Sequence, residues 1–355
     1  MLEDRVWDID PVLIQIDAIN TSVTNGPLQI RYYGLFFAIG LLGAAWAFPN
    51  YFERWGFPRQ HGERLTLWTP IGMIIGAHLV HLIFYEPESF FSDPDRIIQI
   101  GSGLASHGGG IGAILAVLFF ARYHRQHALA LMDPSMCAAT FVIPWVRVGN
   151  FFNSEIVGRA WDGPWAIAFP RHYEVVDGRT VWDCGGPPGA YDVADCMYRH
   201  PSQVYEAILA FAMVGLAIYL QAKWRNRLRP GAILFILLGY YFTTRFLVEY
   251  VKEFQTLSDT FYLTMGQRLS LPIVLLSAYM LLFSKTSNIV KPIAPGELVS
   301  GPRPLPATDP APTKKRAKPA TDEPSDRDAA DASASSSDDE PRARPKKRKK
   351  KKKNR

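Results

Sequence analysis

The region before the last sixty residues of this 355-residue chain lacks net basic charge. Residues 296–355 hold 17 Lys and Arg against 10 Asp and Glu, whereas the residues before them hold 22 against 23. The net charge of +6 therefore belongs to the tail. A nearly neutral folded region lacks the basic surface that nucleic-acid binding needs, so no specific nucleic-acid partner is expected.

The tail also lacks apolar periodicity. Residues 286–355 are rich in Pro, Ala, Ser, Asp and Lys. Such a composition cannot bury a core, and it predicts disorder. The terminal basic run, Lys346–Arg355, suits contact with anionic lipid, worth about 1 kcal/mol per charge. A solvated tail without a specific role explains the run equally well.

Residues 1–29 lack a basic start followed by an apolar core, so no cleavable signal peptide is expected there. Apolar residues alternate from Val12 to Ile16. This pattern predicts an outer N-terminal arm that forms a strand or an interfacial segment.

Long apolar segments dominate residues 30–285, and seven of them could cross a bilayer, which takes about 20 residues. The third is short and glycine-rich, and the first is expected to act as the insertion signal. The predicted fold is an all-α polytopic membrane domain of seven transmembrane helices. The segments are Ile30–Phe52, Thr66–Tyr85, Gly108–Tyr123, Leu131–Gly149, Ser202–Gln221, Gly231–Val251 and Gly266–Phe283.

Loop charge predicts the orientation of these spans. The loops after spans one, three and five are basic, as is the tail, whereas the loop after span two is mainly acidic. Because basic loops stay in the cytoplasm, we expect the N-terminus outside and the C-terminus in the cytoplasm. Residues 150–200 then form a small outer head. An oxidising outer compartment permits a disulfide between Cys184 and Cys196 in that head, with two free thiols as the alternative.

Polar residues gather at the end of span four, where Arg147, Asn150, Asn153 and Glu155 follow one another closely. Charged groups within a membrane usually face an internal cavity and mark a substrate path. Arginine binds phosphate bidentately. Helix capping and interface anchoring are the alternative for these residues, and they explain four polar groups poorly.

Span six carries Tyr241, Arg245 and Glu249 four residues apart, and therefore on one helix face. Arg245 suits an anion site in which Glu249 orients it, although an ion pair that only joins helices is the alternative. His107 precedes a glycine run at the start of span three. Backbone amides at a helix start favour phosphate, and histidine exchanges protons near neutral pH.

Three further positions are candidates on weaker grounds. Tyr33 opens span one, where a tyrosine is also a common interfacial anchor. His200 precedes span five, and Glu206 lies one turn inside it. His78 and His81 could share a helix face, but no third metal ligand is evident, so no metal site is expected. Together the residues describe a site for an anionic phospholipid head group.

Six motifs in register resemble one known family, the phosphatidylglycerol–prolipoprotein diacylglyceryl transferases. They span about residues 28–285. The string around Arg147 departs only in apolar or small positions, such as V-R-V-G-N for G-R-L-G-N, and keeps every polar group. The motifs are R-Y-Y-G-L, S-H-G-G-G-I-G, R-V-G-N-F-F-N-S-E-I-V-G-R, R-H-P-S-Q-V-Y-E, R-F-L-V-E-Y and M-G-Q.

The resemblance implies a seven-helix enzyme of the bacterial inner membrane with a periplasmic head. It implies transfer of diacylglyceryl from phosphatidylglycerol to the lipobox cysteine of a preprolipoprotein, with a thioether formed, glycerol-1-phosphate released and no cofactor. The implied catalytic residues are Tyr33, His107, Arg147, Tyr241 and Arg245. The implied substrate-binding residues are Arg147, Asn150, Glu155, Gly158 and Glu249, and His200 matches a further motif histidine.

Two other functions are compatible with charges inside a membrane. A lipid or solute transporter is one, but the seven spans show no internal repeat. A non-catalytic scaffold that uses the polar residues for helix packing is the other. The scaffold predicts that Arg147 and Arg245 variants unfold, whereas the enzyme predicts folded, inactive protein.

Overall fold

We analysed a computed structural model of the chain. The predicted disordered tail lies outside the residues that it describes. The described residues belong to one compact unit, Met1–Asp309. They are 5–21, 26–98, 103–176, 178–253 and 263–283.

All seven predicted spans are helical, which confirms a multi-pass membrane protein in outline. In the described ranges, five helical stretches are long and apolar enough to cross a membrane, and two apolar helices are shorter. The long stretches are α1 (Tyr32–Arg54), α2 (Arg59–Tyr85), α5 (Ala128–Ala139) with α6 (Ile143–Phe152), α7 (Ser202–Lys223) and α9 (Met265–Leu282); the short helices are α4 (Ser106–Tyr123) and α8 (Ala232–Val248).

The structure differs from the prediction in two spans. Helix α2 begins at Arg59, seven residues before the predicted Thr66, because polar residues continue the helix beyond its apolar part. Span four is two helices, α5 and α6, since the chain leaves regular helix between Ala139 and Ile143. Pro144 in the first turn of α6 suits a new helix start, where its missing N–H leaves no bond unmade.

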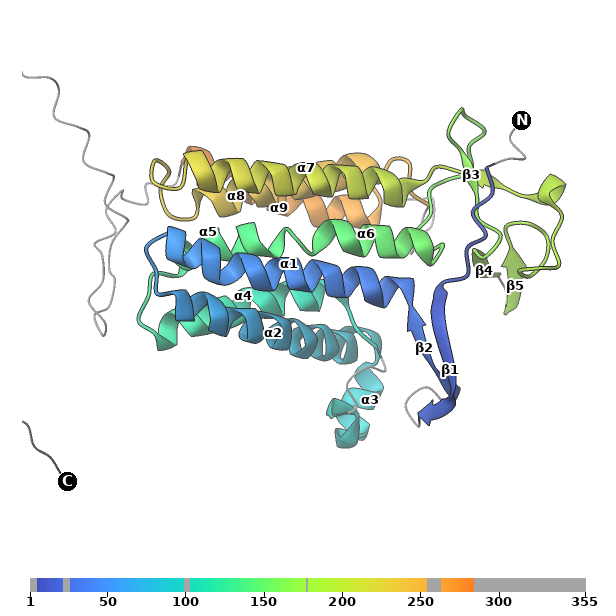
Figure 1. Ribbon diagram of the computed structural model, residues 1–355, viewed down its shortest axis with the longest axis horizontal. Helices are drawn as coiled ribbons and strands as arrows, with labels where there is room; N and C mark the ends of the chain where they lie inside the picture. The colour runs from blue at the N-terminus through green and yellow to red at the C-terminus, as the bar shows by residue number, and fades with distance from the viewer. Residues whose placement is uncertain (1–4, 22–25, 99–102, 177, 254–262, 284–355) are drawn as a thin grey trace, which may run out of the picture. The chain divides into compact units, whose positions relative to one another are not determined.

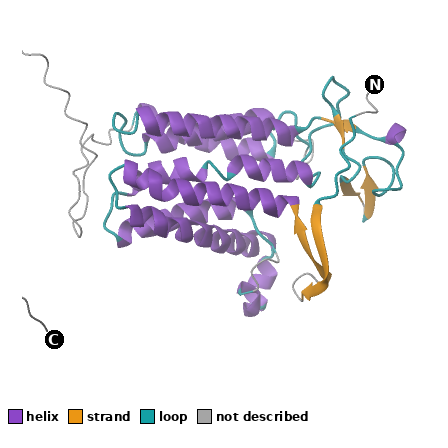
Figure 2. Cartoon of the chain, in the orientation of Figure 1, coloured by secondary structure: helices purple, strands orange, loops and turns teal. Residues whose placement is uncertain are grey.

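Outside the spans the chain is not all-α. The arm forms a hairpin of β1 (Val12–Thr21) and β2 (Gly26–Arg31), which confirms its predicted strand. Two further two-stranded antiparallel sheets lie between α6 and α7 (Figure 2). The remaining short elements are α3 (Pro87–Ser92), η1 (Pro94–Ile97), β3 (Ile167–Ala168), β4 (Tyr173–Val176), β5 (Arg179–Trp182), η2 (Val193–Asp195) and β6 (Tyr198–Arg199).

The predicted head, residues 150–200, lies at one end of the helix bundle (Figure 1). Helix α2 packs against α4 and α1, and α1 packs against α6. The row continues from α6 to α7, α8 and α9. Helices α1, α4, α7 and α9 begin at the head end, and α6 and α8 finish there (Figure 1). The sequence-predicted site residues therefore share one end of the bundle.

The hydrophobic core lies toward the other end of the bundle. It joins the last turns of α1 and α4 to the first turns of α2, α5 and α8, with Phe52, Leu65, Phe120, Leu131 and Ile233 fully buried. Large apolar side chains such as Leu42 and Phe84 are instead mostly exposed, as a lipid-facing surface requires.

Glycines set the distance between α2 and α4. A side chain on Gly108 or Gly112 would collide with the backbone of Gly76 or Gly72. Small residues at such a crossing let two membrane helices approach closely. Two glycines of the predicted phosphate-binding run therefore pack helices together, whereas a side chain on Gly110 would meet no atom within 4 Å.

Candidate active site

Helix α6 places Arg147 and Asn150 on one face, three residues apart. Arg147 donates to the Asn150 side-chain oxygen at 3.4 Å, and the Asn150 amide donates to Glu155 at 3.4 Å. Asn153 donates to the other Glu155 oxygen at 2.8 Å. Both asparagines therefore hold the Glu155 carboxylate, and the structure brings together four residues that the sequence predicted.

The turn after α6 is strained. Ser154 and Ile156 have φ values of 54° and 58°, a region in which a β-branched residue is rare. The start of α7 holds this turn, since Gln203 donates to the Glu155 carbonyl at 2.7 Å and Ser202 donates to the Ile156 carbonyl at 2.8 Å. Such strain persists only where surrounding contacts determine the conformation, and it clusters at functional sites.

A buried ion-pair network links α6, α7 and the end of α8. Glu206 lies 3.3 Å from Arg147 and 3.6 Å from the Lys252 ammonium. Lys252 also lies 3.9 Å from Glu249. The Lys252 and Glu206 residues are only 4% and 8% exposed. Buried charges require such partners.

A small cavity opens among these helices. Its volume is about 20 Å³, roughly enough for one water molecule. Its charged lining residues are Arg147, Glu206 and Arg245, and its hydroxyl-bearing lining residues are Tyr240, Tyr241 and Thr244. The apolar remainder is Ile143, Leu209, Ala210, Met213 and Val248.

Arg245 lines this cavity without a carboxylate partner among the residues that the structure describes. The helix spacing suggested that Glu249 would orient it, but Glu249 pairs with Lys252 instead. Glu249 also packs against Gly266, where an added side chain would come within 2.5 Å of its carboxyl carbon. The α9 N-terminus favours an acidic group at this place.

Two predicted tyrosines lie beside Arg147. Tyr241 interacts electrostatically with Arg147 and lines the cavity. Tyr33 interacts electrostatically with Arg147 and Glu155, and its ring packs against Gly149, where an added side chain would come within 2.7 Å. Both hydroxyls therefore lie close to the predicted arginine.

Gly158 lies where three segments of the chain pass close together, its own and those of His200 and Val251. An added side chain would come within 2.7 Å of the Val251 carbonyl and closer to His200. The Gly158 N–H donates to the His200 carbonyl at 3.0 Å. His200 itself stacks on Trp161, with ring centroids 4.1 Å apart, and burial lowers the pKa of its imidazole. Neither residue lines the cavity.

His107 is exposed in the first turn of α4 and is not among the cavity-lining residues. It shares the head end of the bundle with Arg147, but α4 packs against α2 and α5 rather than against α7 or α8. The proton-transfer role of His107 stays a prediction.

The one group of potential metal ligands found among the described residues joins His172 and Glu174 of the head to Glu253, which follows α8. Arg199 already pairs with the two carboxylates of this group, since its guanidinium lies 2.5 Å from Glu253 and 3.8 Å from Glu174. A metal ion would have to overcome that fixed positive charge.

In span two, His78 contacts the carbonyls of Arg96 and Ile97 through Nε2.

The head cluster shifts the pKa values of its members. Burial acts to raise the pKa of Glu253, but His172, Glu174 and Arg199 lower it to about 2. Burial acts to lower the pKa of His172, but Glu253 and Asp183 raise it overall. Hydrogen bonds and opposite charges thus outweigh burial at both groups.

Comparison with known proteins agrees with the motifs. The family model described as prolipoprotein diacylglyceryl transferase matches residues 20–283. The chain belongs to this family. It is 32% identical to the phosphatidylglycerol–prolipoprotein diacylglyceryl transferase of Tolumonas auensis over 78% of this chain and 96% of that protein. It is similar to the enzymes of the same name from Vibrio cholerae serotype O1 (34% identical, 78% and 92%) and Chloroherpeton thalassium (32%, 78% and 92%).

In this member of the family, sequence reasoning missed Lys252 and gave Glu206 no role. A signal for Lys252 existed, because it lies eleven residues, about three helical turns, after Tyr241. The pairing of Ser202 and Gln203 with the strained turn had no such signal. It depends on two segments about fifty residues apart in sequence.

Proposed function

We infer that the protein transfers the diacylglyceryl group from phosphatidylglycerol to a prolipoprotein. Membership of the family supports the reaction. The observation that carries the site is the cavity shared by Arg147 and Arg245, in which Arg245 lacks an acidic partner in the described structure. The cations Arg147, Arg245 and Lys252 have two carboxylates, Glu206 and Glu249, within ion-pair distance of one or more of them. The third nearby carboxylate, Glu155, is hydrogen-bonded by Asn150 and Asn153 instead. This excess of cations over ion-paired carboxylates favours an anion such as the lipid phosphate.

The reaction forms one bond and breaks one. The sulfur of the lipobox cysteine bonds to the terminal glyceryl carbon of the diacylglycerol unit, and the bond between that carbon and the phosphate oxygen breaks. The electron pair leaves with the phosphate as glycerol-1-phosphate, and the thiol proton passes to a base. Two barriers must fall, since the thiol must ionise and the leaving phosphate must be stabilised.

We assign the phosphate to Arg147 and Arg245. Preorganised cations in a water-poor site stabilise developing charge without reorganisation. Asn150, Glu155 and Glu249 keep the cations and the turn in place, and Tyr33 and Tyr241 offer hydroxyls to head-group or ester oxygens. Gly158 and His200 act indirectly, because their backbone hydrogen bond joins two segments of the chain. Because the cavity is too small for a head group, cavity-lining side chains must move when lipid binds.

His107 is proposed as the base that deprotonates the thiol. Its exposed imidazole at the head end is accessible to a peptide that arrives from outside the bundle. His107→Gln should lower turnover at neutral pH and shift the pH optimum upward, because the thiol, with an ordinary pKa near 8.5, then ionises unaided. Near-normal turnover at pH 7 would exclude the base role.

We propose that residues 30–285 form the catalytic domain in the bacterial inner membrane, with residues 150–200 as the outer head and residues 1–29 as the outer arm. The disulfide in the head and the basic loops at the opposite side support this orientation. The tail from residue 286, which lies outside the described residues, is then cytoplasmic, and a signal peptide with its lipobox cysteine approaches at the head end.

The test is direct. Purified protein would be incubated with phosphatidylglycerol and a lipobox-cysteine peptide, and the diacylglyceryl thioether measured by mass spectrometry. We expect product from the wild type, none from Arg147→Ala, and wild-type yield from Arg171→Ala, which removes a head arginine that does not line the cavity. Equal product from Arg147→Ala would refute the site. No product from folded wild type would favour lipid transport or a scaffold.

A further inference from the structure

Arg199 in the head is surrounded by acceptors. It is 3% exposed, and its Nε and Nη2 donate to the two Asp183 oxygens at 2.6 and 2.7 Å. Its Nη1 donates to Glu253 at 2.5 Å and to the Gly158 carbonyl at 3.3 Å. One planar fork thus joins three separate segments of the chain.

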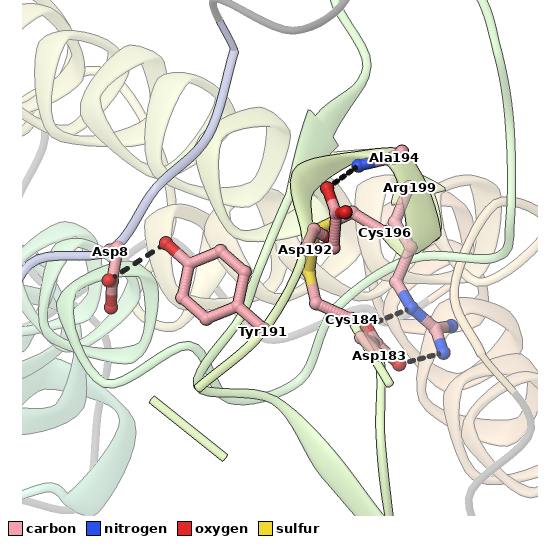
Figure 3. Close-up of a disulfide and its surroundings, with 8 residues drawn as sticks. All are labelled: Asp8, Asp183, Cys184, Tyr191, Asp192, Ala194, Cys196 and Arg199. Carbon is pink, nitrogen blue, oxygen red and sulfur yellow. Dashed lines mark hydrogen bonds and ion pairs between the residues drawn. A yellow bond between two sulfur atoms is a disulfide. The ribbon is translucent and has the colours of Figure 1, made fainter. Parts of the chain in front are cut away.

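On one side, covalent and backbone bonds anchor Asp183. Its neighbour Cys184 forms a disulfide with Cys196, and the N–H of Met197 donates to the Asp183 carbonyl at 2.8 Å. Figure 3 shows the disulfide beside the Asp183–Arg199 pair. The closed loop therefore holds Asp183 next to the strand that carries Arg199.

On the other side, Glu253 directly follows Lys252, whose ammonium lies 3.6 Å from Glu206 in the proposed site. Adjacent side chains here extend in opposite directions, one toward Arg199 and one toward the cavity network. Arg159 adds a bond from its Nε to the Lys252 carbonyl at 2.9 Å. A shift of Glu253 would therefore shift Lys252 and, through Glu206, Arg147.

We propose that Arg199 is a positioning residue for diacylglyceryl transfer, with Asp183 as its anchor and the Cys184–Cys196 disulfide as the clasp that keeps the anchor in place. The inference rests on the proposed function, because Arg199 acts through Lys252 and Glu206. A buried ion pair often adds no stability over apolar residues of similar size. Stability therefore does not explain a buried arginine at this position, whereas the fixed arrangement of the three segments that it joins does.

The experiment compares kcat, KM for phosphatidylglycerol and unfolding temperature for the full-length protein in phosphatidylglycerol-containing micelles. The variants are Arg199→Gln, Arg199→Lys, Asp183→Asn and the double variant Cys184→Ser with Cys196→Ser. The matched control is Arg171→Gln, since Arg171 forms a head ion pair with Asp8 at 2.8 Å that does not reach residues 251–253.

We expect kcat to fall about 100-fold in Arg199→Gln, the loss that a displacement of roughly 1 Å produces, with KM nearly unchanged. Arg199→Lys should recover little, because it lacks the fork. Asp183→Asn and the double cysteine variant should lose about tenfold by weaker positioning, and the control should match the wild type. Treating the wild type with a phosphine reductant should reproduce the loss of the double variant and leave that variant unchanged.

Folded Asp183→Asn and double cysteine variants that turn over like the control would overturn the proposal. If Arg199→Gln does not fold, those two variants and the reductant decide the outcome. Arg147→Ala and Arg245→Ala measured in parallel separate the two proposals. Activity in both arginine variants refutes the site itself, whereas their inactivity beside normal Asp183→Asn refutes only the positioning role.

Discussion

The molecule holds one buried arginine in the head and two partly buried arginines in the bundle, and they are neutralised differently. In the head, Arg199 has Asp183 and Glu253 within 2.7 Å and Glu174 at 3.8 Å. In the bundle, Arg147 has Glu206 at 3.3 Å, a carboxylate that it shares with Lys252. Arg245 lines the same cavity with no acidic partner in the described ranges.

The difference distinguishes an arginine whose donors are already satisfied by carboxylates from the arginines that we propose bind the lipid phosphate. Carboxylates already satisfy the donors of Arg199, so an incoming anion would have to displace them. The bundle has more cations than carboxylates around a cavity, an arrangement that binds an anion with less competition. Buried charge alone therefore does not identify a substrate site, whereas incomplete neutralisation beside a cavity does.

Arg245 should show the largest effect. Arg245→Ala should lower kcat by about 100- to 1000-fold, because a preorganised charge is lost in the transition state. Arg245→Lys should restore only a small part, since lysine cannot bind phosphate bidentately. Product formation measured by mass spectrometry checks both. If Arg245→Ala keeps full activity while folded, the distinction between the two arginine groups fails.

Lys252 should show an intermediate effect. Lys252→Met keeps the length of the side chain but removes the charge, so Glu206 should pair more strongly with Arg147 and compete with the lipid phosphate. We expect activity to fall by about tenfold, the equivalent of roughly 1.4 kcal/mol, mainly through a higher KM. Lys252→Arg should retain most activity. Equal kinetics for Lys252→Met and the wild type would remove Lys252 from the site.

His172 allows a pH test of the head. Its folded pKa is raised above the ordinary 6.5, so its stabilising contribution is complete below that pH and is lost as pH rises through the folded pKa. The unfolding temperature of the wild type should therefore fall more between pH 6 and pH 8.5 than that of His172→Gln. Glu253, with a pKa of about 2, stays ionised over this range. Parallel curves for the two proteins would contradict the assignment.

Glu174 should show the smallest effect. Its carboxylate is about half exposed and lies 3.8 Å from Arg199, which keeps Asp183 and Glu253 without it. Exposed ion pairs contribute about 0–1 kcal/mol, so Glu174→Gln should leave kcat and unfolding temperature nearly unchanged. A loss as large as that expected for Asp183→Asn would show that the head arginine is less well neutralised than its distances imply.

The sequence predicted the seven spans well because apolar length is a local property of the chain. It also predicted that Arg147, Asn150 and Glu155 lie together, since one short helix and its turn carry them. The Cys184–Cys196 disulfide was one of two alternatives, and the structure confirms it.

Partnerships between distant segments were harder to predict. Glu249 pairs with Lys252 and packs against Gly266, which neither helix spacing nor composition reveals. The glycines after His107 were interpreted through phosphate binding, yet two of them permit contact with α2. Both differences arise because a neighbouring helix, absent from the local pattern, decides what a residue contacts.

The left-handed backbone conformation of Ile156 lowers the stability of this enzyme, while it fixes the chain next to Glu155. Glycine adopts that conformation freely, so Ile156→Gly should relieve a cost of about 1–3 kcal/mol there, at the expense of a looser chain next to Glu155. Directed evolution for heat tolerance should find this substitution early. The same substitution should lower diacylglyceryl transfer, because the chain next to Glu155 loses its fixed conformation.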